Sequence, residues 1–252
     1  MLILKSTEDI RKMKIAGEIC VEALCIAKDE ITIGKTTASI DKVIHEYIFS
    51  RNAIPSFLGY RGFPNASCIS INEEVIHGIP SNRKISDGDI VSVDVGVIYE
   101  GFHGDNAYTF AVGDISTKDK QLLEVTKECL FRAIDKAKLP YRIGDIGYTI
   151  ESLANENDFS VVKAYTGHGV GKSLHESPDV PSFGRPGRGM RLMKGMTIAI
   201  EPMVNIGVSD IVVLDNDWTV VSKDNSRSAH FEMSVAITED GNIILTDWRD
   251  LL

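Results

Sequence analysis

An internal repeat limits the folds open to this chain more than any other feature. Residues 6–40 align with residues 116–150 at a constant offset of 110, without a gap, and ten of these 35 positions are identical. Two unrelated segments of this length would share only about two or three residues. The identities include polar pairs such as Asp9 and Asp119, which the helix period alone does not require. The sequence therefore predicts a duplicated structure.

Each copy of the repeat has the pattern of two helices joined by a turn. Ser6 and Ser116 stand at helix-start signals, and apolar residues follow at spacings of three and four. Alternating, β-branched segments after the helices predict strands at 90–99, 102–112, 197–204, 218–221, 230–238 and 242–245. We expect an α+β fold, in which an antiparallel sheet core is flanked by two pairs of helices. It would form a single domain, 1–252, with halves of about 1–112 and 113–252 and a site at their seam.

The composition is that of an acidic globular protein. Its 252 residues carry 27 Lys and Arg against 36 Asp and Glu, a net charge of −9. Because phosphate binding depends on clustered basic residues, we expect no nucleic-acid partner. No apolar run approaches the roughly 20 residues of a membrane span, and no secretory signal is visible, so we expect no membrane partner and a cytoplasmic location. Scattered cysteines without a C-x-x-C pair predict buried free thiols.

Two aspartates lie in adjacent predicted strands. Segment 90–98 alternates, with valines on one face and Asp94 on the other. If the next strand pairs symmetrically about a turn near Glu100, residues whose numbers sum to 199 face each other, and Asp94 lies opposite Asp105. Carboxylates so placed repel unless a proton or a cation lies between them. The pair predicts a divalent metal, and the alternative is that one aspartate ends in water or that a bulge shifts the register.

Two glutamates lie in similarly apolar surroundings. Glu201 interrupts an apolar strand just before Pro202, and Glu232 lies within the apolar segment 229–237. Burying an unpaired carboxylate is costly, and metal ligation is one of the few routine ways to offset that cost. Both glutamates are therefore candidate metal ligands.

His168 lies in a glycine-rich segment, 166–175, whose glycines allow a close approach to a ligand. The segment fails the spacing of a phosphate-binding loop, which argues against a nucleotide. The pair His175-Glu176 is not a zincin motif either, because Pro178 stands where the helix would have to continue.

These residues lie in motifs that resemble those of the type I methionine aminopeptidases. The resemblance covers essentially the whole chain and rests on segments 72–80, 94–97, 101–105, 166–171, 174–176, 200–205 and 229–232. Together the motifs are very specific, although any one alone would be weak. The resemblance implies the duplicated pita-bread fold that creatinase and the proline aminopeptidases also use.

The resemblance further implies a metal centre with two divalent ions. Its ligands would be Asp94, Asp105, His168, Glu201 and Glu232. Asp105 and Glu232 would bridge the ions, Asp94 would complete one, and His168 with Glu201 the other. One imidazole among four carboxylates is a fairly hard donor set, which suits Mn²⁺, Fe²⁺ or Co²⁺ better than a thiolate zinc site would. The metal is thus iron, manganese, cobalt or zinc, with its identity open.

Three residues are implied to carry the chemistry around that centre. Glu201 would carry the proton, His175 would donate a hydrogen bond to the tetrahedral oxyanion, and His77 would contact the peptide near the scissile nitrogen. His230 lies two positions before Glu232, so it could support a ligand rather than bind metal. For a lone histidine the structural alternative is the more common, and only the motifs reverse it.

The resemblance also implies an apolar pocket for a methionine side chain. Its residues would be Tyr60, Phe63, Cys68 and Trp218. Simple core packing of these aromatic residues is the alternative. The sequence departs from the family at Phe57, where relatives often carry cysteine, and at Leu174, where they often carry phenylalanine. Either the two changes in size compensate or the pocket is reshaped.

The expected function is removal of the initiator methionine from nascent chains whose second residue is small. The partners would be the N-terminal peptides of those chains, with a possible transient ribosome contact, and the enzyme would be a monomer. An X-Pro aminopeptidase of the same fold is one alternative, and a non-catalytic peptide- or RNA-binding relative is another. Retention of all five ligands argues against the second.

Overall fold

The computed structural model describes residues 2–252 as four long helices around a curved antiparallel sheet. The helices are α1 (Thr7–Glu30), α2 (Thr37–Ser50), α3 (Thr117–Lys136) and α4 (Ile143–Glu156), with a short 3-10 turn at Tyr60–Gly62. The strands are β1 (Ile54–Pro55), β2 (Ser67–Ile71), β3 (Glu74–Ile76), β4 (Ile90–Tyr99), β5 (Phe102–Ala111), β6 (Ser160–Val161), β7 (Gly167–Gly169), β8 (Glu176–Val180), β9 (Thr197–Ile200), β10 (Met203–Asn205), β11 (Ile211–Val213), β12 (Val220–Ser222), β13 (Ser228–His230), β14 (Glu232–Ile237) and β15 (Asn242–Ile244).

The predicted helical pairs are confirmed, and their first turns are built alike. Ser6 caps α1 by accepting from the backbone N–H of Asp9, whose carboxylate accepts from the Ser6 N–H in return. Ser116 and Asp119 form the same reciprocal pair at the start of α3. Such a box satisfies donors that the first helical turn cannot satisfy itself.

The ungapped offset of 110 is wrong beyond the first helix of each copy. The starts of α1 and α3 differ by 110 positions, but α1 has 24 residues and α3 has 20, so α2 and α4 start 106 apart. Gly34 is a left-handed turn residue, whereas Gly144 lies inside α4, so their identity is not an equivalence. Because four residues make about one helical turn, the shift leaves the apolar face unchanged and is hard to detect from periodicity.

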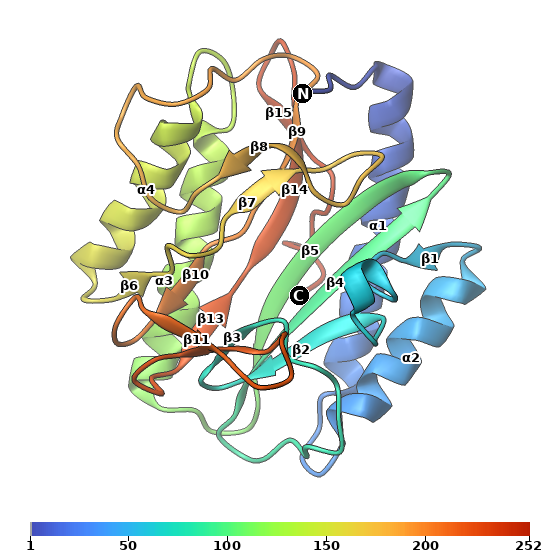
Figure 1. The fold of residues 1–252 in the computed structure, drawn as a ribbon, viewed down its shortest axis with the longest axis vertical. Helices are drawn as coiled ribbons and strands as arrows, with labels where there is room; N and C mark the ends of the chain where they lie inside the picture. The colour runs from blue at the N-terminus through green and yellow to red at the C-terminus, as the bar shows by residue number, and fades with distance from the viewer. Residues whose placement is uncertain (1) are drawn as a thin grey trace.

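The main sheet has nine strands and joins the two halves. Its central order is β1-β4-β5-β14-β9-β7-β8, with β2 added beside β4 and β15 beside β14. In Figure 1, α1 and α2 (blue) lie on one side of the molecule and α3 and α4 (yellow-green) on the other, with the sheet curving between them. The seam lies where β5 of the first half pairs with β14 of the second. The expected α+β architecture with two flanking helical pairs is thus confirmed.

The predicted pairing of Asp94 with Asp105 is wrong by two residues. In the β4–β5 hairpin, paired residue numbers sum to 201, so Asp94 faces Ala107 and Asp105 faces Gly96. The turn consists of Glu100 and Gly101, both with positive φ, which is the conformation of a tight two-residue hairpin. Because side chains alternate with period two, the shift keeps both aspartates on one face, as diagonal neighbours.

Two predicted strands are each broken in the second half. Segment 197–204 is divided into β9 and β10 at Glu201 and Pro202, and segment 230–238 is divided at Phe231. The cysteines are free, and all are buried except Cys25, which is half-buried. Among residues 2–252, none of the helices combines the length and the hydropathy that crossing a bilayer would take.

Candidate metal centre

Strand pairing alone brings the predicted ligands to one face of the sheet. Asp94 on β4 and Glu232 on β14 both pair with Ala107 of β5, and Asp105 stands two residues before Ala107. His168 on β7 pairs with Ala199 of β9. Glu201 follows two residues after Ala199. Ser234, which lies two residues after Glu232, pairs with Ala199 from the other side of β9. Steps of two preserve the face of a strand, so all five side chains share one face.

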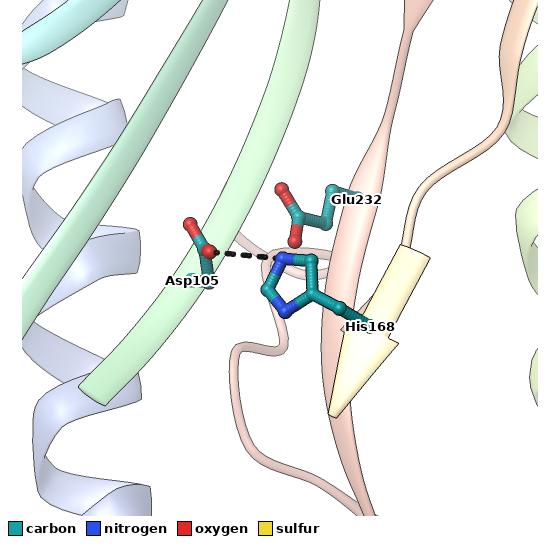
Figure 2. A group of neighbouring side chains, drawn as sticks. All are labelled: Asp105, His168 and Glu232. Carbon is teal, nitrogen blue, oxygen red and sulfur yellow. Dashed lines mark ion pairs between the residues drawn. The ribbon is translucent and has the colours of Figure 1, made fainter. Parts of the chain in front are cut away.

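Three of these side chains converge closely. Asp105, His168 and Glu232 each offer a ligand atom within 4.8 Å of the others, and all three residues are buried. Figure 2 shows them projecting from three different strands toward a common point. His168 Nε2 lies 3.6 Å from Asp105 Oδ2 and 3.7 Å from Glu201 Oε1, distances that are too long for direct hydrogen bonds.

The ring of His168 is oriented to present a lone pair to the carboxylates. Its Nδ1 lies 2.9 Å from the carbonyl oxygen of Gly169, and since a carbonyl only accepts, Nδ1 must donate. In the neutral ring Nε2 is then an acceptor that faces Asp105 and Glu201. A metal ion bound to Nε2 would satisfy this lone pair and attract both carboxylates.

The carboxylates at this site resist ionisation in the absence of a cation. Burial, with the charge of Glu201 adding to it, raises the pKa of Asp94 to about 7. Burial and the neighbouring acidic groups hold the pKa values of Asp105 and Glu232 well above their usual range. Perturbed groups that share a cleft are typical of functional sites.

Glu201 differs from the other three carboxylates. Burial alone would raise its pKa, but the imidazoles of His230 and His168 lower it overall. His230 Nε2 lies 3.4 Å from Glu201 Oε2, close enough for electrostatic attraction but without the alignment of a directed hydrogen bond. Glu201 is therefore the carboxylate best kept ionised here, and His230 contributes more than its sequence position suggested.

Unpartnered atoms test whether these residues suit a metal. Oδ1 of Asp94, Oδ1 of Asp105 and Oε1 of Glu232 are buried and have no hydrogen-bond partner among residues 2–252. Buried polar atoms almost always find partners, so three such oxygens at one place require an explanation. Oxygen-rich clusters of this kind bind divalent ions, so the residues fit a metal centre.

An apolar pocket adjoins the cluster in a cavity of about 310 Å³. The cavity is lined by all of the site residues expected from the sequence, namely Tyr60, Phe63, Cys68, His77, Asp94, Asp105, His168, His175, Glu201, Trp218 and Glu232. Phe63, Cys68, Phe57 and Leu174 form one buried apolar cluster. The two positions that depart from the family are thus packed together, as compensating changes in size require.

Two histidines stand at the border between the cluster and the apolar pocket. His77 has a positive φ of 58° and packs edge-on against Tyr165 and Trp218. His175 stacks on Tyr60, whose hydroxyl lies 2.9 Å from Nδ1. Burial lowers the pKa of each imidazole to about 4, and for His175 the nearby His168 adds to the effect. Both rings are therefore neutral near pH 7.

Sequence reasoning missed several residues that line the cavity. They are Arg61, Ile76, Ala164, Tyr165 and Thr166. Tyr165 directly precedes the glycine-rich segment and contacts His77, and that adjacency was the available signal for it. Arg61 lies in the short turn with an unusual positive φ of 50°, which nothing in its residue type indicates.

A duplicated antiparallel fold around a buried carboxylate–histidine cluster defines the class of pita-bread metallopeptidases. The chain belongs to metallopeptidase family M24, whose profile matches residues 11–239. It is 48% identical over 246 residues to a methionine aminopeptidase of Clostridium perfringens, covering 98% of this chain and 99% of that one. It superposes on the crystal structure of methionine aminopeptidase from Rickettsia prowazekii with a TM-score of 0.96, 40% identity and coverage of 98% and 100%. The resemblance and the fold inferred from the sequence are confirmed.

The fold is also shared with a proline-specific relative. The prolidase from Pyrococcus furiosus matches with a TM-score of 0.81 and 25% identity, over 97% of this chain and 65% of the prolidase. Family membership and the side-chain cluster together indicate a divalent metal centre. The choice between the two activities depends on the pocket.

Proposed function

We propose that this protein is a methionine aminopeptidase that removes the initiator methionine from new chains whose second residue is small. The observation that carries the proposal is the single cavity in which the carboxylate–histidine cluster meets a pocket of aromatic, aliphatic and thiol side chains. Aromatic rings make favourable contacts with a thioether, so the pocket suits an unbranched sulfur-containing side chain. Identity of 48% to a methionine aminopeptidase supports the same conclusion.

Five residues would hold two divalent ions. They would be Asp94, Asp105, His168, Glu201 and Glu232, the set that the sequence resemblance implies. The converging positions of Asp105, His168 and Glu232 and the unpartnered carboxylate oxygens support this ligand set. The hard donor set favours manganese, iron or cobalt, with zinc as a further candidate.

The bound ions would lower the pKa of a shared water and polarise the scissile carbonyl. Glu201 would take up the proton of the attacking water and pass it to the leaving amine; its lowered pKa means that the carboxylate is ionised, as a proton acceptor must be. A hydrogen bond from the Tyr60 hydroxyl to Nδ1 would leave His175 Nε2 as an N–H donor toward the carbonyl oxygen. His77, neutral and held between two aromatic rings, would contact the scissile nitrogen.

The pocket residues would contact different parts of the methionine side chain. Phe63 and Trp218 meet edge-on with ring centroids 5.1 Å apart and would enclose the side chain. Cys68 lies opposite Asp94 across β2 and β4, and this pairing supports a methionine pocket directly beside the proposed centre. We expect a bulky second residue to clash near the metal ions, which would restrict cleavage to chains whose second residue is small.

An X-Pro aminopeptidase is the second candidate, since a prolidase shares the fold. The apolar lining and the higher identity to methionine aminopeptidases favour the first. The deciding experiment is metal-titrated turnover of Met-Ala-Ser, Met-Lys-Ser and Ala-Pro-Ser by the full chain. We expect release of methionine from Met-Ala-Ser alone, with metal analysis showing bound divalent ions. Cleavage of Ala-Pro-Ser in preference, or no turnover with any metal, would refute the proposal.

We further propose that residues 1–252 form a single catalytic domain of two halves, about 1–112 and 113–252, and that the enzyme is a cytoplasmic monomer. Its partners would be the N-terminal peptides of nascent chains, met through transient ribosome contact. The exposed segment 185–191 supports that contact, because Arg185, Arg188 and Arg191 lie there beside Arg142. Arg185, Arg188 and Arg191 lie close together in the sequence and could offset the net negative charge of the protein locally.

A further inference from the structure

The loop that carries His175 is held by an ion pair that no sequence motif indicated. Lys5, in the segment before α1, places its Nζ 2.5 Å from Oε2 of Glu176, the residue directly after His175. Only 3% of the Lys5 side chain and 5% of the Glu176 side chain are exposed. Lysine and glutamate are almost never fully buried unless they are paired, so the contact is a built feature rather than a surface coincidence.

Glu176 transmits this contact to the backbone of the loop. Its Oε1 accepts from the backbone N–H of Ser173 at 3.1 Å, while Oε2 accepts from Lys5. Within the same loop the N–H of Gly171 donates to the carbonyl of Ser173. The carboxylate therefore holds the middle of the short segment from Gly171 to His175, at Ser173.

The ion pair packs closely against Gly171. A Cβ at Gly171 would lie 2.4 Å from Cε of Lys5 and 2.6 Å from Oε1 of Glu176, so a larger residue there would force these side chains to shift. Lys5 is fixed in turn, because its backbone N–H donates to the carbonyl of Gly195 and its Nζ donates to the carbonyl of Ile3. The N-terminal segment thus packs behind the loop that carries His175.

The loop connects the ion pair to two parts of the site. Glu176 begins β8 and pairs with Gly169, the neighbour of His168 on β7. Leu174 is anchored independently, by its packing with Phe57, Phe63 and Cys68. His175 lies outside that cluster; its ring contacts Tyr60 and the ring of His168, at a centroid distance of 4.1 Å, and its position otherwise depends on the course of the loop. Loss of the ion pair would therefore displace His175 more than Leu174.

We propose that Lys5 is a positioning residue for the peptidase reaction: by holding the Glu176 carboxylate in place, it fixes the loop that presents His175 to the substrate. The proposal rests on the proposed function. Residues that orient a catalytic group without touching substrate typically contribute about 10- to 100-fold. The contribution should fall on kcat, because His175 acts on the developing oxyanion rather than on the bound methionine.

Lys5→Met alone would leave the buried Glu176 carboxylate without a cationic partner and can destabilise the fold. The test variant is therefore Lys5→Met with Glu176→Gln, which removes both charges. The matched control is Lys194→Met with Glu239→Gln, an exposed ion pair of 2.7 Å elsewhere on the surface. Both variants are made in the full chain, with His175 intact and with His175→Ala, and are assayed on Met-Ala-Ser at saturating metal.

We expect the double variant, Lys5→Met with Glu176→Gln, to lose about 30-fold in kcat, with KM changed less than about three-fold. A loss of this size is in the range for residues that act through another residue. In the His175→Ala background the same change should cause no further loss. Hydrogen exchange at the Ser173 amide should accelerate in the Lys5 variant and stay unchanged in the control. An equal loss in both backgrounds, a loss confined to KM, or unaltered exchange at Ser173 would overturn the proposal. If the unmodified chain releases no methionine, the proposed function fails, and the exchange measurement alone decides whether Lys5 holds the loop.

Discussion

The two halves of the molecule supply the proposed metal centre in different ways. The first half contributes Asp94 and Asp105 from one continuous hairpin of two ten-residue strands. The second half contributes His168 from a three-residue strand, Glu201 from a break between two short strands and Glu232 from the start of β14. The imidazoles of His168 and His230 lower the pKa of Glu201, whereas the pKa values of Glu232 and of both aspartates are raised. The first half thus provides carboxylates alone, and the second adds the imidazoles that keep one carboxylate ionised.

The largest expected effect tests whether Asp105 of the first half and Glu232 of the second half contribute equally as ligands shared by the two proposed ions. Asp105→Ala and Glu232→Ala should each abolish binding of both ions and lower kcat/KM by more than about 10³-fold, because the acidity of the bound water is lost. Asp94→Ala, in contrast, should remove one ion and leave the other. Metal content by elemental analysis and turnover of Met-Ala-Ser measure this. If Asp105→Ala retains activity, the bridging assignment is wrong.

The raised pKa values predict an unusual pH dependence for the metal-free protein. An aspartate whose pKa is 3.8 when unfolded and about 7 when folded binds more protons in the folded state between those values. Stability therefore falls as the pH rises from about 4 to 7, by on the order of 4 kcal/mol for this group at 1.36 kcal/mol per unit. Melting temperatures of chelated and metal-loaded protein from pH 5 to 8 test this. A chelated protein as insensitive to pH as the loaded one would contradict it.

A smaller effect is expected where the halves meet in the pocket. Phe57 comes from the first half and Leu174 from the second, and both belong to the same buried cluster. Phe57→Cys leaves a void and Leu174→Phe overfills the site, so each should lower kcat/KM about tenfold, near 1.4 kcal/mol. The double variant should recover most of that loss, since contacting residues are coupled. Additive losses in kcat/KM would show that the pocket is reshaped rather than compensated.

The smallest effect concerns the matched helix caps. Ser6→Ala and Ser116→Ala should each cost about 1 kcal/mol of unfolding free energy, the usual value of an N-cap. The two aspartates that complete these caps should differ in their contribution to the free energy of unfolding. Asp119 is 3% exposed and also binds Arg227 at 2.9 Å, whereas Asp9 is partly exposed. Asp119→Ala should therefore destabilise more than Asp9→Ala in urea unfolding. Equal costs for the two would mean that the Arg227 contact contributes nothing.

The same contrast explains what could be predicted from the sequence. Long alternating strands and capped helices have local signatures, so the bounds of β4 and the start of α1 were predicted correctly. The hairpin register was wrong because Glu100 adopts a positive φ that its residue type does not indicate. The strand of His168 is too short for any periodic signal, so only family motifs located it. Lys5 and Glu176 are 171 positions apart, and no local pattern reports such a contact.

The alternation of the β4–β5 hairpin restricts how its length can change. One residue inserted in β4 between Asp94 and the turn would turn the Asp94 carboxylate to the helix-covered side of the sheet. One residue inserted in β5 between the turn and Asp105 would do the same to Asp105. Two inserted residues would restore its direction. Natural or engineered length variants that keep the centre intact should therefore differ there by even numbers of residues, whereas surface loops elsewhere are free of this parity.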